Sequence, residues 1–185
     1  MPLKSERINI IGASGTGKTT LGKALSARLS FSYFDSDDYY HLPTDPPFRQ
    51  ARSPDERLKL VEQDLGQHPT WILSGAVANW QPTPRLDYSL VIFLYLPPEI
   101  RLARLRKRES QLYSSRILKG GDMAEDHQFF MNWTSGYDLG SCEGTNTLPH
   151  HEAVLKSLTC SSLRLSGPMT VEEQIQRILQ NFNDT

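Results

Sequence analysis

The sequence predicts an α/β fold with a central parallel sheet, and two observations lead to this class. Short apolar runs of strand length recur along the 185 residues, and segments with helical apolar spacing separate them. Strands that are apolar throughout are typical of parallel sheets with helices on both faces, joined by right-handed crossovers. Because this length fits one domain of ordinary size, we expect a single three-layer domain over residues 1–185.

The first half of the chain justifies this class element by element. Apolar runs predict strands over residues 8–11, 31–34 and 71–73. A helix with one apolar face is expected after the glycines that follow the first run. A second helix begins at Ser53, where a Ser-Pro-Asp-Glu string offers a cap and a proline for the first turn. Residues 41–52 contain three prolines and are expected to form a loop.

The second half continues the alternation. The most hydrophobic run predicts a strand over residues 90–96, and a fifth strand is expected over 160–165. A helix opens at Pro98 and is expected to continue to about Arg108. Thr170 begins a second capping box, which opens a C-terminal amphipathic helix.

Two segments between these elements are less regular. Residues 110–122 are mostly polar, contain two adjacent glycines and are expected to form a small mobile lid. Residues 138–149 are expected to form a loop. A helix before that loop carries an aromatic face that we expect to belong to the core: Phe129, Phe130, Trp133 and Tyr137.

The composition excludes several classes of protein. Apolar residues make up 38% and charged residues 22%, which argues against disorder and against a fibrous chain. A net charge of -1 argues against a nucleic-acid partner. No run approaches the ~18 apolar residues of a membrane span, and residues 1–7 lack a signal-peptide pattern, so no membrane partner is expected. The two cysteines, Cys142 and Cys160, lack CxxC spacing and suit a reducing cytoplasm, where we expect the protein to be located.

Residues 12–19 carry the chemistry of the chain. They read Gly-Ala-Ser-Gly-Thr-Gly-Lys-Thr, a complete G-x-x-x-x-G-K-[ST] string between a strand and an amphipathic helix. Backbone N–H groups of such a loop surround phosphate oxygens, and the helix N-terminus adds positive potential. Lys18 would neutralise the β- and γ-phosphates of ATP, and Thr19 would offer its hydroxyl to Mg²⁺. The expected nucleotide-binding residues are Gly12, Ala13, Ser14, Gly15, Thr16, Gly17, Lys18, Thr19 and Thr20.

The rest of the chain distinguishes among the enzymes that use such a loop. Asn146 and Asn183 do not belong to the N-K-x-D string with which GTPases read their base. The acidic strand end of ATP-driven motors is also missing, because the expected strands end in Ser74-Gly75 and Leu96-Pro97. These absences favour a kinase.

Four further strings carry a family resemblance. Tyr33-Phe34-Asp35-Ser36-Asp37 is similar to the F-x-D-x-D string that ends strand two in shikimate kinases, and Ile72-Leu73-Ser74-Gly75 resembles the I-L-D-G string of nucleotide kinases. Residues 101–108 resemble an arginine-rich helix that leads into a lid, and residues 164–167 resemble an adenine-side loop. Over about its full length, the chain resembles the adenylate kinase and shikimate kinase branch of small P-loop kinases.

The resemblance implies a P-loop NTPase fold with sheet order 2-3-1-4-5. It also implies adenylate kinase-like, ATP- and Mg²⁺-dependent phosphoryl transfer to a small-molecule or nucleotide acceptor, by a monomer or homodimer. Two departures favour an unusual acceptor. Ser74 replaces the usual acid, and the phenylalanine-proline-arginine continuation after Gly75 is missing. A nucleotide-binding regulatory ATPase without a small-molecule acceptor remains the alternative.

Three aspartates follow the second strand, at the edge where parallel sheets bind ligands. Asp35 could support Mg²⁺ in place of an acid at Ser74. If the extended geometry persists, Asp37 faces the same cleft and could deprotonate the acceptor hydroxyl. Asp38 would point away. The alternative is a solvated turn with capping aspartates.

Arginines gather in two places. Arg101, Arg104 and Arg108 share one helix face, and Arg104, Arg108 and Arg116 are the candidates for contact with the transferred phosphoryl group. The alternative for this face is solvated charge. A second set either binds an anionic acceptor or flanks a helix: Arg49, Arg52 and Arg57. The predicted catalytic residues are therefore Lys18, Asp37, Arg104, Arg108 and Arg116, and the predicted metal-binding residues are Thr19 and Asp35.

Overall fold

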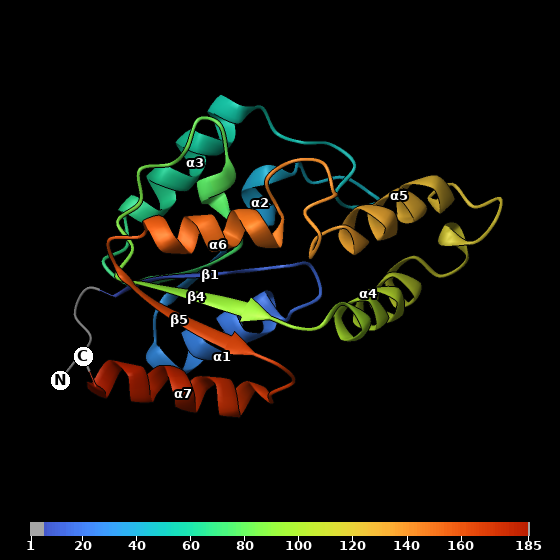
Figure 1. Ribbon diagram of the computed structural model, residues 1–185. Coiled ribbons are helices and arrows are strands. Elements are labelled where there is room, and N and C mark those ends of the chain that lie inside the picture. Colours follow the sequence, from blue (N-terminus) through green and yellow to red (C-terminus); the bar gives the residue numbers. More distant parts are fainter. Residues whose placement is uncertain (1–5, 185) are drawn as a thin grey trace.

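A five-stranded parallel sheet forms the centre of the molecule (Figure 1). The computed structural model describes residues 6–184, so the expectation made for the start of the chain lies partly outside the described residues. The strand order β2-β3-β1-β4-β5 confirms the predicted topology. The strands are β1 (Arg7–Gly12), β2 (Ser32–Asp35), β3 (Trp71–Ser74), β4 (Leu90–Tyr95) and β5 (Ser161–Ser166).

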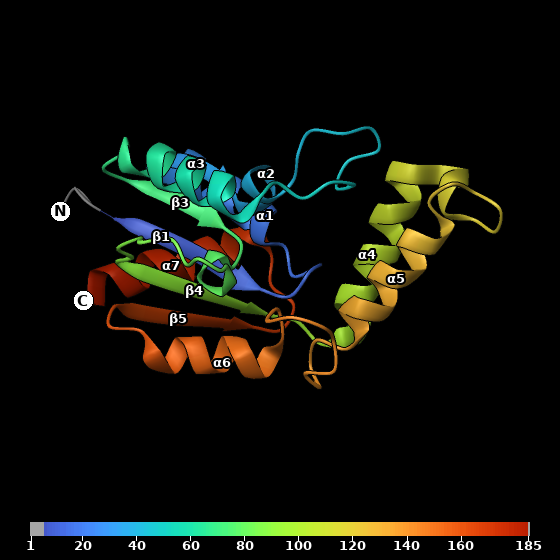
Figure 2. The same cartoon turned by 90° about the horizontal axis from the view of Figure 1, so that it is seen from above.

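Helices cover both faces of this sheet. Helices α1 and α7 lie on one face, and α3 and α6 lie on the other (Figure 1). Helices α4 and α5 stand beyond the carboxyl ends of the strands as a separate hairpin (Figure 2). The helices are α1 (Lys18–Leu29), α2 (Ser36–Tyr40), α3 (Pro54–Gly66), α4 (Pro98–Tyr113), α5 (Ala124–Ser135), α6 (Leu148–Ser157) and α7 (Val171–Asp184).

Apolar side chains fill the space between the layers. Between the sheet and helices α1 and α7, the buried residues include Ile10, Leu25 and Ile178. On the other face, Val61 and Trp71 belong to a second buried cluster. A fully buried side chain of this size contributes about 1.5–3 kcal/mol, so these two layers hold the strand ends in fixed positions.

The capping predictions are confirmed at α3 and α7. The Ser53 hydroxyl accepts a hydrogen bond from the backbone N–H of Glu56 at 3.4 Å. The Thr170 hydroxyl accepts one from the backbone N–H of Glu173 at 3.2 Å, and the Glu173 carboxylate accepts one from the backbone N–H of Thr170 at 2.7 Å. Each of these helices therefore begins where its capping box predicts.

Helix α4 is longer than the sequence analysis predicted. It continues past Arg108 to Tyr113, so the expected lid starts in a helical turn. Its buried residues, Arg101, Leu105, Glu109 and Tyr113, recur every fourth position. Two of these four are charged, which hid the buried stripe from a search for apolar spacing.

The aromatic face expected in the core is only partly buried. Tyr137 is 2% exposed, but Phe129 is 66% exposed. Phe130 and Trp133 are half-buried. The prediction of a core position is wrong for Phe129, because α5 packs against α4 as an outlying hairpin and turns one side to solvent (Figure 2).

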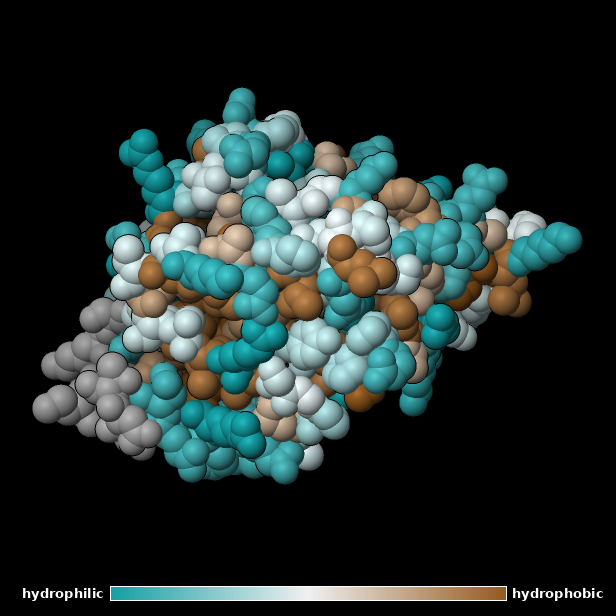
Figure 3. Space-filling view, viewed as in Figure 1, coloured by the Kyte–Doolittle hydropathy of each residue, from teal (hydrophilic) through white to brown (hydrophobic). Residues whose placement is uncertain are grey.

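Helix α6 was not predicted. It starts at a cap, since the Thr147 hydroxyl accepts a hydrogen bond from the backbone N–H of His150 at 3.3 Å, and Pro149 lies in its first turn. Among residues 6–184, no helix combines the length and apolar character that crossing a bilayer requires. On the face shown in Figure 3, apolar residues are scattered among polar ones.

Candidate active site

The glycine-rich loop between β1 and α1 has the backbone of a phosphate cradle. Gly12, Gly15 and Gly17 have φ angles of 145°, 83° and 99°, which favour glycine. A Cβ on Gly15 would lie 2.7 Å from the backbone oxygen of Arg101, so the loop packs closely against α4. The Thr16 hydroxyl donates to the backbone oxygen of Ala13 at 2.8 Å. The loop is therefore held from both sides, and Ser14 lies half-buried at its tip.

Lys18 reaches back across this loop. Its Nζ atom donates to the backbone oxygens of Gly12 and Ala13, both at 3.0 Å. Burial lowers the pKa of Lys18, and the negative fields of Asp37 and Asp35 oppose that effect. Phosphate oxygens placed in the cradle would give this ammonium group a stronger acceptor than two carbonyls.

The predicted metal-binding residues lie in direct contact. The Thr19 hydroxyl donates to Oδ2 of Asp35 at 2.9 Å. The Tyr33 hydroxyl donates to the same oxygen at 2.9 Å. In the described part of the chain, no group of three or more His, Cys, Asp or Glu side chains forms a metal cage.

This donor set fits Mg²⁺. The ion prefers oxygen ligands, and proteins commonly hold it with one or two carboxylates together with substrate phosphates. Thr19 and Asp35 would supply the oxygens from the protein, and the adjacent cradle is where the phosphates would lie. The Ser74 hydroxyl cannot supply a charge, and it donates to the backbone oxygen of Lys18 at 3.1 Å.

The structure corrects the predicted geometry of Asp37. The extended conformation ends at Asp35, whose carboxylate caps α2 by accepting from the backbone N–H of Asp37 at 3.2 Å. Asp37 is thus in a helical turn, not two positions along a strand. Its side chain is open to solvent. Enclosure by surrounding protein and repulsion from Asp35 nevertheless raise the pKa of Asp37, while Lys18, His41 and Arg108 act against the rise.

Asp37 is therefore close enough to Lys18 and Arg108 for their charges to act on its pKa. Asp35 and Asp37 are linked through this helix cap rather than along an extended strand, and their action at one site stays a prediction. Asp38 is exposed one residue further along the same short helix.

The predicted arginines divide into two groups. Arg104 lies beside the P-loop, with Nη1 3.9 Å from the position of a Cβ on Gly17. Arg108 donates to Glu109 at 3.0 Å and is also close enough to lower the pKa of Asp37. Arg116, in contrast, is paired in the lid region, where its Nη2 atom lies 2.7 Å from Oδ2 of Asp122.

Arg101 is a structural residue rather than part of an exposed arginine face. It is 0% exposed, pairs with Asp138 and donates to the backbone oxygen of Thr134 at 2.8 Å. Its guanidinium carbon lies 5.0 Å from the centroid of the Tyr137 ring. Arg101 therefore joins α4 to the end of α5. Thr20, predicted to bind the nucleotide, is exposed in the first turn of α1.

The three arginines on the acceptor side have different surroundings. Arg52 donates to the backbone oxygen of Tyr39 at 3.0 Å and is structural. Arg49 forms an ion pair with Asp126 at the start of α5. The Arg57 guanidinium lies 4.5 Å from the Tyr40 ring centroid and 5.1 Å from that of Trp80. Within the described chain Arg57 has no carboxylate partner, and its buried Nε atom has no hydrogen-bond partner.

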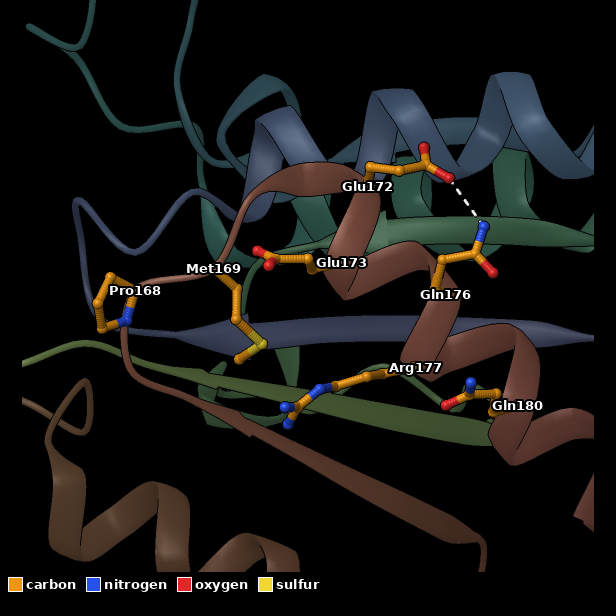
Figure 4. A pocket seen from close by; sticks show the side chains of 7 residues that line it. All are labelled: Pro168, Met169, Glu172, Glu173, Gln176, Arg177 and Gln180. Carbon is orange, nitrogen blue, oxygen red and sulfur yellow. Dashed lines mark hydrogen bonds between the residues drawn. The ribbon is translucent and has the colours of Figure 1, made fainter.

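A hollow lies beyond the loop that the resemblance assigns to the adenine side. It is an open groove of about 470 Å³ that begins at Pro168 and runs along α7, and the Gln176 side chain donates to Glu172 beside it at 2.8 Å (Figure 4). None of its lining residues belongs to the P-loop, so we do not assign it to phosphoryl transfer.

Comparison with known proteins places this site in a family. Residues 8–128 match the family described as "AAA domain". The chain is 41% identical over 174 residues to YqaC, an uncharacterised protein of Bacillus subtilis, covering 94% of this chain and 96% of the relative. It is 30% identical over 128 residues to a shikimate kinase of Thermosynechococcus vestitus, covering 63% of this chain and 69% of that enzyme. The chain belongs to the small P-loop kinases of the shikimate kinase-like branch.

Two further similarities agree with this membership. A gluconokinase of Arabidopsis thaliana is 40% identical over 127 residues, covering 56% of this P-loop kinase and 67% of the relative. The crystal structure of shikimate kinase from Aquifex aeolicus matches with a TM-score of 0.53 at 15% identity, covering 96% of each chain, which shows the fold alone. The family match ends at residue 128, so Tyr137 and all of α6 lie beyond it.

Sequence reasoning missed two residues of the site. Tyr33 donates to Asp35, one of the two predicted metal-binding residues, and His41 is close enough to act on the pKa of Asp37. The alternation along β2 could have identified Tyr33, because residues two apart in a strand share a face and Asp35 was already a candidate. No sequence signal marked His41.

Proposed function

We propose that this P-loop kinase transfers the γ-phosphoryl group of ATP, with Mg²⁺, to a hydroxyl group of a small anionic acceptor. The observation that carries the proposal is the position of Asp37, whose backbone N–H donates to Asp35, the carboxylate that also accepts from Thr19 beside the P-loop. A carboxylate is thus available beside the phosphate cradle on the side of α2 and α3. That is the arrangement that transfer to a hydroxyl requires.

The nucleotide side of the proposal uses the P-loop and its neighbours. Lys18 and the loop amides would hold the phosphates, and Thr19 and Asp35 would hold the metal, which when bound neutralises charge on the β- and γ-phosphates. Arg104 and Arg108 would stabilise the charge that spreads over the transferred oxygens. Arg116 would contribute to this stabilisation only after its ion pair with Asp122 has broken.

The acceptor side of the proposal uses Asp37 as the proton acceptor. The proton of the acceptor hydroxyl passes to Asp37 as the new O–P bond forms, and the bond from the γ-phosphorus to ADP breaks. Because its surroundings raise the pKa of Asp37, this carboxylate is a stronger base than an ordinary aspartate.

Arg57 supports an acceptor that carries negative charge. It lies against the rings of both Tyr40 and Trp80, and among the described residues it has no carboxylate partner. An unpaired guanidinium of this kind suits a carboxylate, which can accept two parallel hydrogen bonds from it. Shikimate and gluconate, named by the relatives, are both hydroxylated carboxylic acids. A nucleotide acceptor, as in adenylate kinase, is the competing outcome.

The test is coupled ADP release over a panel of acceptors with matched chemistry. The panel contains hydroxylated carboxylic acids, neutral polyols of the same size and nucleoside monophosphates. We expect at least one acid to raise ATP turnover many-fold and its neutral counterpart to leave turnover unchanged. If no acceptor raises ATP turnover, the result would support the regulatory ATPase. If only a nucleoside monophosphate raises it, the proposal of a hydroxylated carboxylic acid as acceptor would be overturned.

Two matched variants test the assigned residues with the acceptor found. Asp37→Asn should keep ATP affinity and lose about 10²-fold or more of the transfer rate, within the range for a positioned general base. Asp38→Asn is the control, since it makes the same change one residue away on α2. Equal rates for both variants and the wild type would show that the aspartates only form a turn.

A further inference from the structure

The carboxylate of Asp35 is held by three donors. Its Oδ2 atom accepts from the Thr19 hydroxyl and from the Tyr33 hydroxyl, both at 2.9 Å. Its Oδ1 atom accepts from the backbone N–H of Asp37 at 3.2 Å. Of these donors, Thr19 belongs to the nucleotide site and the amide belongs to the α2 cap. Tyr33 has no role in either.

The position of Tyr33 follows from the pleat of β2. Residues two apart on a strand point to the same face, so Tyr33 lies directly before Asp35 on the face that α1 covers. Its ring packs against α1 at Gly22. A Cβ on Gly22 would lie 2.5 Å from Cε2 of Tyr33 and 2.6 Å from Oγ of Ser74.

Gly22 therefore makes the room in which the tyrosine ring lies. A glycine inside a helix lowers its stability by about 1 kcal/mol relative to alanine. The chain carries this cost in α1 at a position where a larger side chain would displace both Tyr33 and Ser74. Because α1 packs closely against the Tyr33 ring at Gly22, the ring lies where its hydroxyl can donate to the Asp35 carboxylate.

The neighbouring strand explains why the orientation of this carboxylate matters. Ser74 is paired with Asp35 in the register of β2 and β3, and it is 1% exposed. It is neutral and its hydroxyl donates to the backbone oxygen of Lys18. Since β3 offers no charge here, Asp35 is the carboxylate in contact with Thr19.

We propose that Tyr33 is a positioning residue that fixes the Asp35 carboxylate for binding of the magnesium–nucleotide complex. The proposal rests on the metal role assigned to Asp35 under the proposed function. When the Thr19 hydroxyl is engaged by the bound metal, the Tyr33 hydroxyl remains as a side-chain donor to Oδ2. Tyr33 stands at the phenylalanine position of the F-x-D-x-D string, so its hydroxyl is the group that this chain adds.

The experiment measures metal binding rather than turnover. Mn²⁺ serves as the probe for Mg²⁺, and its affinity for the protein–ADP complex is measured by electron paramagnetic resonance. Tyr33→Phe keeps the ring against Gly22 and removes only the hydroxyl. We expect this variant to bind Mn²⁺ about 10-fold more weakly, the lower end of the range for lost support of a metal ligand. Its ADP affinity in excess EDTA and its melting temperature should match the wild type.

Two further variants separate the possible outcomes. Tyr39→Phe is the matched control, because its hydroxyl also donates to a carboxylate, that of Asp64 at 3.1 Å, away from the P-loop. It should leave Mn²⁺ affinity unchanged. Asp35→Asn should weaken Mn²⁺ binding more than Tyr33→Phe does. Wild-type Mn²⁺ affinity in Tyr33→Phe alone would overturn the positioning role, whereas wild-type affinity in Asp35→Asn would overturn the metal role on which it rests.

Discussion

At the scale of single residues, Lys18 is the residue whose role in phosphoryl transfer follows most directly from the P-loop motif. Its ammonium group contacts only loop carbonyls in the described structure, while burial lowers its pKa. Lys18→Ala should therefore lower phosphoryl transfer by about 10²-fold or more, because the developing phosphate charge loses its nearest cation. The measurement is acceptor-dependent ADP release, with circular dichroism to check folding.

Arg28→Ala provides the control for this change. It removes an exposed cation from the last turn of the same helix, where no phosphate is expected. A Lys18→Ala protein that is folded and transfers phosphate at the wild-type rate would contradict the P-loop assignment itself.

His151 is a second residue of interest, because the protein around it determines its protonation state. It is 0% exposed, its Nδ1 atom lies 2.7 Å from the Tyr137 hydroxyl, and its Nε2 atom is buried without a hydrogen-bond partner. Burial lowers the pKa of His151 to about 4, and the charges of Lys18 and His150 act in the same direction. The folded protein therefore keeps this imidazole neutral at pH 7.

This histidine should make the protein less stable in acid. An unfolded histidine takes up its proton near pH 6.5, whereas folded His151 does so only near pH 4, so the unfolded chain binds more protons between these values. Its contribution to the free energy of unfolding should fall by about 2 kcal/mol between pH 7 and pH 5. Urea denaturation at both pH values should show a correspondingly smaller fall in His151→Asn. An equal fall in both proteins would contradict the buried neutral state.

At the scale of elements, the sequence predicts what local chemistry determines. The five strands and helices α1, α3 and α7 follow from apolar runs and capping boxes, and the structure confirms them. The end of α4 could not be predicted, because Arg101 and Glu109 occupy buried positions that apolar spacing does not reveal. Those two residues are buried through partners far along the chain, such as Asp138 and His127, which the sequence does not place nearby.

The same limit applies to the site. The motif placed Lys18 and Thr19, and the strand end placed Asp35, because both depend on short strings. The helix that carries Asp37 depends on a single cap by Asp35, and the contact of Tyr33 with that carboxylate depends on a glycine in another element. Contacts of this kind appear only when the strands are packed.

The lid segment, residues 110–122, is the element for which we predict a nucleotide-dependent change. Tyr113 is buried at the end of α4, but Leu112 and Leu118 are 59% and 62% exposed, so little apolar burial holds this segment beyond Tyr113. Such segments open at low free energy. With Mg²⁺ and ATP at about 100 times Kd, amide exchange over these residues should slow by up to about 100-fold. Hydrogen exchange with and without the nucleotide measures this, and equal protection would contradict a closing lid.

At the scale of the whole molecule, two separate parts meet over the site. The hairpin of α4 and α5 stands apart from the sheet, and the loop of residues 41–52 extends toward it from the other side (Figure 2). Arg49 pairs with Asp126 at the start of α5, and Arg116 lies 3.9 Å from Asp45. Both ion pairs connect the loop on the acceptor side with the lid and α5.

These two ion pairs predict that the loop of residues 41–52 and the lid become more mobile together. The paired side chains are partly exposed, so each pair stabilises the contact by about 1 kcal/mol at most. Removing one pair should leave the global stability nearly unchanged but raise the population in which the loop and the lid are apart. Salt should have the same effect, because it screens exposed charges.

Asp126→Asn tests this coupling directly. In the protein without nucleotide, amide exchange should increase by up to about fivefold both in residues 41–52 and in residues 114–126, the factor that corresponds to 1 kcal/mol. Glu152→Gln is the matched control, because it removes the exposed pair that Glu152 forms with Arg164 between α6 and β5. An increase in the lid alone would show that the loop on the acceptor side moves independently, so that acceptor binding could not be communicated to the lid through these ion pairs.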